Sequence, residues 1–341
     1  MSVAQDTSFR SILIIKPGAM GDLLHLTPVL RGLKKKYLDA KITVLVGSVA
    51  SEELFRYNPN VDATIVYDRW HVHKSFQALR VLRRQLAREC FDLVINFQRS
   101  NLKTWFLATA ALPCRLLIYH KSRGKVIQAV EDHLKTVVSL DLPYDGLDLD
   151  FFVGAEDAAW AASYLNDHGC VEHRVVAMNL GASNRIKCWS PRQFVGLADR
   201  LMTEGIRVLL IGGGMERDLA NEVQSLVRQP CLDLVGALSI GQLGAVLARC
   251  NLLVSGDTGP LHLATAVKTP VIALFGAIDP RRTGPVGEGH RVIVHDEISC
   301  VPCNAKECTN PVRLKCMEKI TVEEVYLAII EMLARRNPTD D

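Results

Sequence analysis

Short apolar runs alternate along the chain with longer stretches in which apolar residues recur every three or four positions. The short runs are typical of strands buried on both faces, and the longer stretches have the period of amphipathic helices. This alternation predicts an α/β fold built on doubly wound parallel sheets. The expected strands are 11–16, 41–47, 63–67, 92–97, 174–180, 207–212, 231–236, 251–255 and 270–276, and the expected helices are 22–37, 74–89, 191–204, 216–229, 239–249, 259–268 and 322–336.

One acidic stretch, DLPYDGLDLD at 141–150, interrupts the alternation, which then starts again. A chain of 341 residues is also longer than a single hydrophobic core usually supports. We therefore expect two Rossmann-like domains, 1–150 and 151–341, joined near this stretch. The final helix, 322–336, could pack on its own domain or back on the first one.

The sequence has no export or membrane-spanning signal. The first ten residues, MSVAQDTSFR, lack the apolar centre of a signal peptide. The best candidate for a membrane span, 105–119, is interrupted by Pro113 and Arg115. A cytoplasmic location is therefore expected, and the ten cysteines are then thiols or metal ligands rather than disulfides.

Charge is distributed unevenly between the two halves. Residues 1–150 carry 21 Lys and Arg against 15 Asp and Glu, whereas the remainder carries 19 against 22. A basic first half points to an anionic partner there, such as nucleic acid, a phospholipid surface or a phosphorylated glycan. Ordinary solvated helix surface would account for the same charges equally well.

The stretch KPGAMGDLLH, 16–25, joins the first expected strand to the first expected helix. Gly18 and Gly21 would let backbone N–H groups at a helix start approach an anion. The pattern is not the G-x-G-x-x-G of a dinucleotide site, and the second strand does not end in the acid that would hold a ribose. Asp22 is either a favourable charge at a helix start or a general base on a glycine turn.

A second candidate site is NLGASNRIKCWSPRQF, 179–194, which follows another expected strand. Ser183 and Lys187 lie in a loop whose hydroxyl and cationic donors suit a phosphate, although a solvated loop has a similar composition. Ser190 is expected to cap the next helix, with Pro191 at its first position.

Two more expected strands end in glycines and acids. In IGGGMERD, 211–218, Glu216 could bond a ribose or a base, or only lie in the first turn of a helix. In SGDTGPLHLATA, 255–266, Asp257, Thr258 and Gly259 form a turn whose amides could face an anion. His262 follows one helical turn later, where a structural hydrogen bond is the commoner role.

Three of these segments together resemble the ADP-heptose:lipopolysaccharide heptosyltransferases, glycosyltransferase family 9, and more the type II and III enzymes than type I. They are IKPGAMGDLLHLTPVLRGLKKKY from residue 15, GASNRIKCW from residue 181 and DTGPLHLATAVKTPVIALFGAIDP from residue 257. The resemblance extends from about residue 11 to about residue 330.

The resemblance implies the GT-B architecture, in which two Rossmann-like domains face each other across a cleft. The first domain would hold the acceptor and the second the nucleotide sugar. It implies inverting transfer of heptose from ADP-L-glycero-D-manno-heptose to the inner core of lipopolysaccharide, with no cofactor or metal required. Asp22 corresponds to the family's general base and Lys187 to its diphosphate-binding lysine. The remaining donor-site positions are Ser183, Glu216, Asp257, Thr258, Gly259 and His262.

The same resemblance gives the basic first half a meaning. Gly18 and Gly21 belong to the N-terminal motif on the acceptor side. The residues expected to contact the phosphorylated inner core or the anionic leaflet are Lys34, Lys35, Lys36, Arg80, Arg83 and Arg84. A peripheral contact with the cytoplasmic leaflet of the inner membrane is therefore expected, and a nucleic-acid partner is not.

Four cysteines lie close together in CVPCNAKECTNPVRLKC, namely Cys300, Cys303, Cys308 and Cys316. Such a cluster is typical of zinc or iron–sulfur sites, but its spacing matches no standard pattern. Two interpretations stay open, a structural metal and reduced thiols that pack a loop. A catalytic metal is not expected.

Other functions also stay open from the sequence. A family 9 transferase could use another nucleotide sugar or another acceptor. A two-lobed sugar-binding protein without catalysis would share the cleft, although such proteins are normally exported. An NAD-dependent epimerase is disfavoured because the ribose-binding acid is missing.

Overall fold

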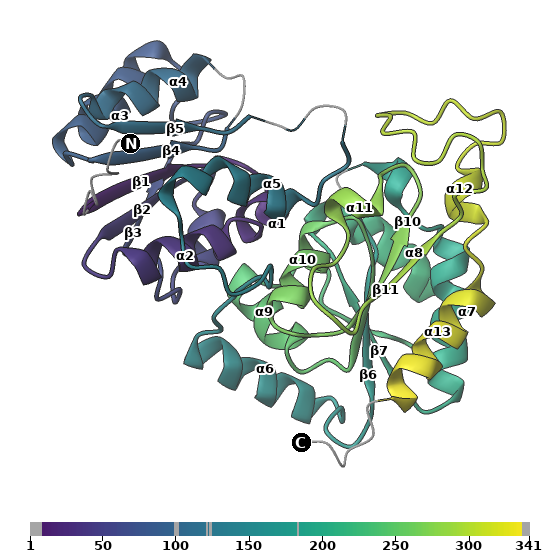
Figure 1. Cartoon of the computed structure of the whole chain (residues 1–341). Helices are drawn as coiled ribbons and strands as arrows, with labels where there is room; N and C mark the ends of the chain where they lie inside the picture. Colours follow the sequence, from purple (N-terminus) through teal and green to yellow (C-terminus); the bar gives the residue numbers. More distant parts are fainter. Residues whose placement is uncertain (1–8, 99–101, 121, 123–124, 183, 336–341) are drawn as a thin grey trace. The chain divides into compact units, whose positions relative to one another are not determined.

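The computed structural model describes residues 9–98, 102–120, 122, 125–182 and 184–335. The chain forms two compact units with the boundary between Phe152 and Val153, close to the expected one. Each unit is a parallel sheet with helices on both faces (Figure 1). The predicted α/β fold with two Rossmann-like sheets is confirmed. Among the described residues, no helix combines the length and the apolar character that crossing a membrane would need.

The first unit has the strand order β3-β2-β1-β4-β5, with every neighbouring pair parallel. The strands are β1 (Ser11–Ile15), β2 (Lys41–Val46), β3 (Ala63–Val66), β4 (Leu93–Asn96) and β5 (Arg115–Ile118), and the helices are α1 (Met20–Leu24), α2 (Thr27–Lys36), α3 (Phe76–Arg88), α4 (Leu102–Ala108) and α5 (Ala129–Thr136). The chain continues from β1 to β2 on one side and later returns to β4 on the other. The strand order therefore reverses between β1 and β4.

The second unit has the strand order β11-β10-β9-β6-β7-β8 and is also parallel throughout. The strands are β6 (Val175–Asn179), β7 (Arg207–Ile211), β8 (Leu232–Asp233), β9 (Leu252–Gly256), β10 (Val271–Phe275) and β11 (Arg291–Val294), and the helices are α6 (Ala155–Asp167), α7 (Pro191–Thr203), α8 (Arg217–Leu226), α9 (Ile240–Leu247), α10 (Gly259–Ala266), α11 (Pro280–Thr283), α12 (Lys315–Glu318) and α13 (Val322–Ala334). Here the strand order reverses between β6 and β9.

The core of the second unit settles where the last helix belongs. Val325 and Ile329 of α13 are buried in one cluster with Phe194 and Leu197 of α7 and with side chains of β6, β7, β9 and β10. Figure 1 shows α13, in yellow, beside α7. The final helix therefore packs on its own unit and does not return to the first.

The single helix expected over 22–37 is in fact two helices, α1 and α2. Pro28 lies in the first turn of α2 and has no N–H to donate to the carbonyl of Leu24, so the first helix cannot continue through it. The Thr27 hydroxyl donates to that carbonyl instead, over 2.8 Å. This break leaves α1 as a separate short helix directly after β1.

Several elements do not appear among the predicted ones, namely α4, β5, α5, α6, α11, β11 and α12. The strands β5 and β11 are at the edges of their sheets and are mostly not buried, and their apolar runs, 116–118 and 292–294, are only three residues long. The expected helix start at Ser190 is confirmed, because the Ser190 hydroxyl accepts from the Gln193 amide and Pro191 is the first helical residue.

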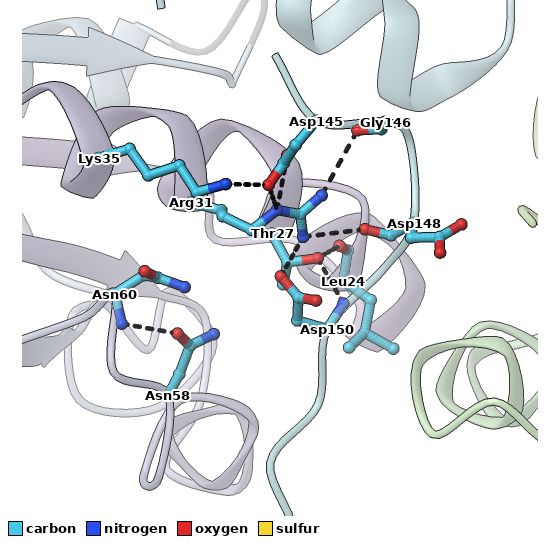
Figure 2. A network of polar contacts seen from close by, with 10 residues as sticks. All are labelled: Leu24, Thr27, Arg31, Lys35, Asn58, Asn60, Asp145, Gly146, Asp148 and Asp150. Atoms are coloured by element: carbon cyan, nitrogen blue, oxygen red, sulfur yellow. Dashed lines mark hydrogen bonds and ion pairs between the residues drawn. The ribbon is translucent and has the colours of Figure 1, made fainter. Parts of the chain in front are cut away.

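The acidic stretch 141–150 is fastened to α2 through Arg31 (Figure 2). The Arg31 guanidinium donates to the Asp145 carboxylate over 2.9 Å, to the carbonyl of Asp148 over 3.1 Å and to the Asp150 carboxylate. Partial burial alone would raise the pKa of Asp145, but hydrogen bonds from Lys35 and Arg31 outweigh it and lower that pKa. The stretch is therefore held on the first unit by a mostly buried cation.

Helix α5 is fixed to the first unit by a buried histidine. The ring of His133 packs against those of Phe97 and Tyr119, and its Nδ1 lies 3.3 Å from the carbonyl oxygen of His25, which follows α1. Burial lowers the pKa of His133 to about 4, and the nearby Lys16 ammonium acts in the same direction. The imidazole is therefore neutral at pH 7.

We expect Arg31→Ala to lower the free energy of unfolding of the first unit by about 2–3 kcal/mol, because it leaves partly buried carboxylates and carbonyls without their donor. Urea denaturation followed by intrinsic fluorescence measures the change. Lys35→Ala is the matched control and should cost less than about 1 kcal/mol, since this exposed lysine contributes a surface ion pair. Equal losses in the two variants would contradict a central role for Arg31.

Acid should destabilise the first unit through His133. The pKa is 6.5 for an unperturbed histidine and about 4 in the folded chain, so the unfolded chain takes up a proton between these values that the folded chain does not. Stability should therefore fall as the pH falls below about 6.5, by about 2 kcal/mol at pH 5 from this residue alone. Chemical denaturation at pH 7.5 and pH 5 tests this. His133→Gln should flatten the pH dependence, and His173→Gln, at an exposed position, should leave it as it is.

Candidate active site

Asp22 lies on α1, immediately after the turn that leaves the central strand β1. Its side chain is about half exposed, and one carboxylate oxygen is 3.7 Å from the Nζ of Lys16. A Cβ added at Gly18 would lie only 2.9 Å from the Asp22 side chain. Gly18 is therefore required by the close approach of that side chain, and Asp22 is presented at the strand-order reversal between β1 and β4.

Lys16 is a buried cation beside this exposed carboxylate. It is the first residue after β1 and is only 8% exposed. The neutral His133 ring lies near both Lys16 and Asp22 and adds no charge to the pair. The amide nitrogen of Asn96, at the end of β4, is buried and has no hydrogen-bond partner among the described residues. The site thus combines one ammonium, one accessible carboxylate and an unused donor.

In the second unit, Lys187 and Asp257 form a close ion pair. Lys187 ends a single 3₁₀ turn, Arg185–Lys187, and Asp257 follows β9. Their side chains are 19% and 11% exposed, and Nζ lies 2.6 Å from Oδ2. A Cβ at Gly256 would lie 2.8 Å from the Lys187 carbonyl oxygen. The glycine at the end of β9 therefore lets the lysine loop pass directly over the strand.

Asn179 connects the ends of β6 and β9. Its amide nitrogen is within hydrogen-bonding distance of the Gly181 carbonyl at 2.9 Å, the Ser255 hydroxyl at 3.1 Å and the Thr258 hydroxyl at 3.0 Å. The two hydroxyl oxygens are also 2.9 Å apart. This network occupies the strand-order reversal of the second sheet, where ligands of doubly wound folds bind.

The start of α10, beside this network, has backbone amides that could bind an anion. Thr258 is the N-cap residue, but its side chain makes no capping hydrogen bond with the helix. The first-turn amides of Gly259 and Leu261 are therefore left to another acceptor, and Pro260 between them has no amide hydrogen. Backbone amides and the positive end of the helix dipole suit a phosphate at this position.

Glu216 reaches the same edge of the sheet from the end of β7. One carboxylate oxygen accepts from the Gly213 amide over 2.8 Å. A Cβ added at Gly181 would lie 2.1 Å from the Glu216 side chain, so the acid packs directly over the glycine that follows β6. The structure thus gathers Lys187, Glu216 and the Asp257–Gly259 turn at adjoining carboxyl ends of the second sheet.

One expected donor-site residue is not part of this group. His262 lies within α10 and is only 4% exposed, which matches the structural role of a histidine at this position better than ligand contact. Ser183 lies outside the described residues.

Some of the cations expected on the acceptor side form contacts within the first unit, and others are exposed. Lys34 donates to the carbonyl of Ala40 over 2.9 Å and to the Asp62 carboxylate over 3.1 Å. Arg83 donates to the carbonyls of Phe106 and Thr109. Both therefore hold the first unit together. Arg80, on α3, is exposed.

The cysteine cluster forms part of the wall behind the lysine loop. Cys300, Cys303, Cys308 and Cys316 line a cavity of about 20 Å³ together with Ile186. Burial raises the pKa of Cys316, and the three other thiols act in the same direction. Throughout the described ranges, no group of three or more His, Cys, Asp or Glu side chains is placed so that it could hold a metal ion. Both interpretations of the cluster, a structural metal and reduced thiols that pack a loop, therefore stay predictions.

This loop supports the lysine turn directly. The Asn184 side chain donates to the carbonyl of Lys306 over 2.6 Å, and the Asn304 amide donates to the carbonyl of Ala277, after β10. The cysteine-containing segment thus braces the residues that carry Lys187.

Four polar residues of these sites have no role in the sequence analysis, namely Lys16, Asn96, Asn179 and Ser255. Each lies at the end of an apolar strand or directly after it, and each is nearly fully buried. A polar residue that closes a buried parallel strand is the signal that would have found them.

The chain is similar to proteins of a known family. Residues 79–313 match the model of "Glycosyltransferase family 9 (heptosyltransferase)". The lipopolysaccharide heptosyltransferase 3 of Escherichia coli is 30% identical over 76% of this chain and 81% of its own length.

Two solved structures share the fold. A family 9 glycosyltransferase from Veillonella parvula has a TM-score of 0.84 and 24% identity, covering 96% of this chain and 98% of its own. The ADP-heptose lipopolysaccharide heptosyltransferase II of Escherichia coli has a TM-score of 0.78 and 21% identity, covering 95% and 99%. The family match spans more than half of the sequence, and the chain belongs to glycosyltransferase family 9.

Proposed function

We propose that this glycosyltransferase transfers heptose from ADP-heptose to the inner core of lipopolysaccharide, with inversion and without a metal. The observation that carries the proposal is the group of Lys187, Asp257 and Thr258 at the strand-order reversal of the second sheet. The donor and the acceptor class follow from the relatives, which include an ADP-heptose enzyme and a lipopolysaccharide heptosyltransferase.

The diphosphate is the part of the donor that this group fits best. An ammonium has three N–H donors, and Lys187 uses one of them on Asp257, so the others can meet phosphate oxygens. The uncapped amides at the start of α10 supply further donors. Glu216 is proposed to accept from a hydroxyl of the ribose or the sugar, and Asp257 from a sugar hydroxyl.

Asp22 is proposed to act as the general base. As its carboxylate takes the proton of the acceptor hydroxyl, that oxygen bonds to the anomeric carbon. The bond from this carbon to the phosphate oxygen breaks on the opposite face, which inverts the configuration. ADP leaves with the electron pair, and Lys187 and the α10 amides stabilise its added charge in the place of a metal. The proton then passes from Asp22 to solvent.

The lipid-linked acceptor also places this chemistry at a membrane surface. We include contact with the cytoplasmic leaflet in the proposal for that reason.

Asp22→Asn should reduce the rate of heptose transfer by about 10²–10⁴-fold, because the amide cannot accept the proton, while leaving ADP binding intact. Single-turnover assays with ADP-heptose and purified acceptor measure the rate, and calorimetry measures ADP binding. Asp39→Asn, at an exposed aspartate of the same unit, is the matched control and should transfer normally. Normal transfer by the Asp22 variant would assign the base to another group.

The donor assignment is tested by titrating the protein with ADP, UDP and GDP in a calorimeter. ADP should bind selectively, and Lys187→Met should weaken it by about 10–100-fold, the value of a charge-assisted hydrogen bond. Lys306→Met, at an exposed lysine, should bind ADP normally. Selective UDP or GDP binding would indicate a family 9 enzyme with another donor. Binding of none of the three would favour a sugar-binding protein without catalysis.

A further inference from the structure

An apolar face of α4 is exposed although the helix is already packed on its other side. Thr104, Leu107 and Ala108 are buried against the first unit. On the opposite side Leu102 is 88% exposed and Trp105 is 44% exposed. A short helix that is apolar on both sides is normally buried, so this outer face is available to a partner.

Helix α3 lies beside α4 and extends the same surface (Figure 1). Phe76, 65% exposed, has its ring centroid 5.7 Å from that of Phe106 on α4. Arg83 stacks on the Phe106 ring at 4.9 Å and holds the two helices together. Phe76, Arg80 and Arg84 follow each other at intervals of four residues and therefore share one side of α3.

The charge of α3 has one sign only. Its sequence FQALRVLRRQLAR contains four arginines and no acidic residue. Arg80 and Arg84 are exposed and have neither a hydrogen bond nor an ion pair within the described ranges. The segment leading into α3 continues this composition, with exposed Trp70 under the guanidinium of Arg69.

We propose that the α3–α4 surface, formed by Phe76, Arg80 and Arg84 of α3 and Leu102, Trp105 and Phe106 of α4, docks on an anionic phospholipid bilayer. Exposed Trp, Phe and Leu beside arginines is the composition of elements that lie in the membrane interface. The aromatic and leucine side chains would enter the headgroup region while the arginines meet lipid phosphates.

A second copy of this chain is a poorer occupant. A symmetric dimer through this face would bring the arginines of the two α3 helices together without an acidic residue on either helix to balance them. An anionic leaflet satisfies the same charges and the apolar side chains at once. The inference rests on the leaflet contact in the proposed function and names the surface that makes it, but it does not depend on the roles proposed for Asp22 or Lys187.

The test is co-sedimentation of the full chain with vesicles that contain no glycolipid. Vesicles of phosphatidylglycerol and phosphatidylethanolamine should bind the protein, and vesicles of phosphatidylcholine should bind it at least tenfold less tightly. Leu102→Ser with Trp105→Ser should weaken binding about tenfold or more by removing apolar burial. Arg80→Glu with Arg84→Glu should do the same by reversing charge, and this variant should also lose most of the salt dependence.

Matched controls come from exposed residues of the second unit. Leu226→Ser with Leu327→Ser and Arg228→Glu with Arg249→Glu make the same kinds of change elsewhere and should bind vesicles normally. Thermal unfolding and ADP calorimetry confirm that every variant is folded, and they separate failure of this inference from failure of the proposed donor site.

Two results would overturn the inference. In the first, the α3–α4 variants bind anionic vesicles as tightly as the control variants do. In the second, the protein does not bind vesicles and sedimentation velocity shows a dimer that Trp105→Ser dissociates. This result would make the surface an interface between protein chains.

Discussion

When helices cover both faces of a parallel sheet, charged and polar side chains are accommodated at the ends of its strands. Both candidate sites follow from this constraint. Ile12, Leu13, Ile14 and Ile15 of β1 are completely buried, so the first place for a charge is Lys16, directly beyond the strand. In the second sheet Asn179 and Ser255 occupy the corresponding places on β6 and β9. Because both sheets reverse their strand order beside these strands, neighbouring loops diverge there and leave room for a ligand.

The two units use the same pair of charges in different ways. Lys187 and Asp257 are 2.6 Å apart and mostly buried, so their geometry is fixed before any substrate arrives. Lys16 and Asp22 are 3.7 Å apart, and the carboxylate is 51% exposed. A fixed, enclosed ammonium suits binding of a diphosphate, whereas an accessible carboxylate with a cation behind it suits proton transfer. The difference between the units is thus one of exposure rather than of residue type.

The local sequence pattern predicts structural features that depend on neighbouring residues. It does not predict features that depend on contacts between segments far apart in the sequence. The strands of both sheets other than β5 and β11, the Ser190 cap and the glycine turns could be predicted because their causes lie within a few positions. The break at Pro28 was missed, although its cause is equally local, because the apolar period of 22–37 continues through it. Asn179 could not be recognised as a hub, since its partners Ser255 and Thr258 lie 76 and 79 residues away.

The basic first half shows why net charge alone does not locate a partner. Arg31, Lys34 and Arg83 are neutralised or hydrogen-bonded within the first unit. Much of the excess positive charge of the first half therefore stabilises the fold of that unit. What is left exposed includes Arg80 and Arg84, on the helix that lies beside the open apolar face of α4. Solvated helix surface accounts for the arginines but not for Leu102 and Trp105 beside them. The two helices pack together and expose cationic and apolar side chains side by side. An anionic bilayer can bind both kinds of side chain, whereas water solvates only the cationic ones.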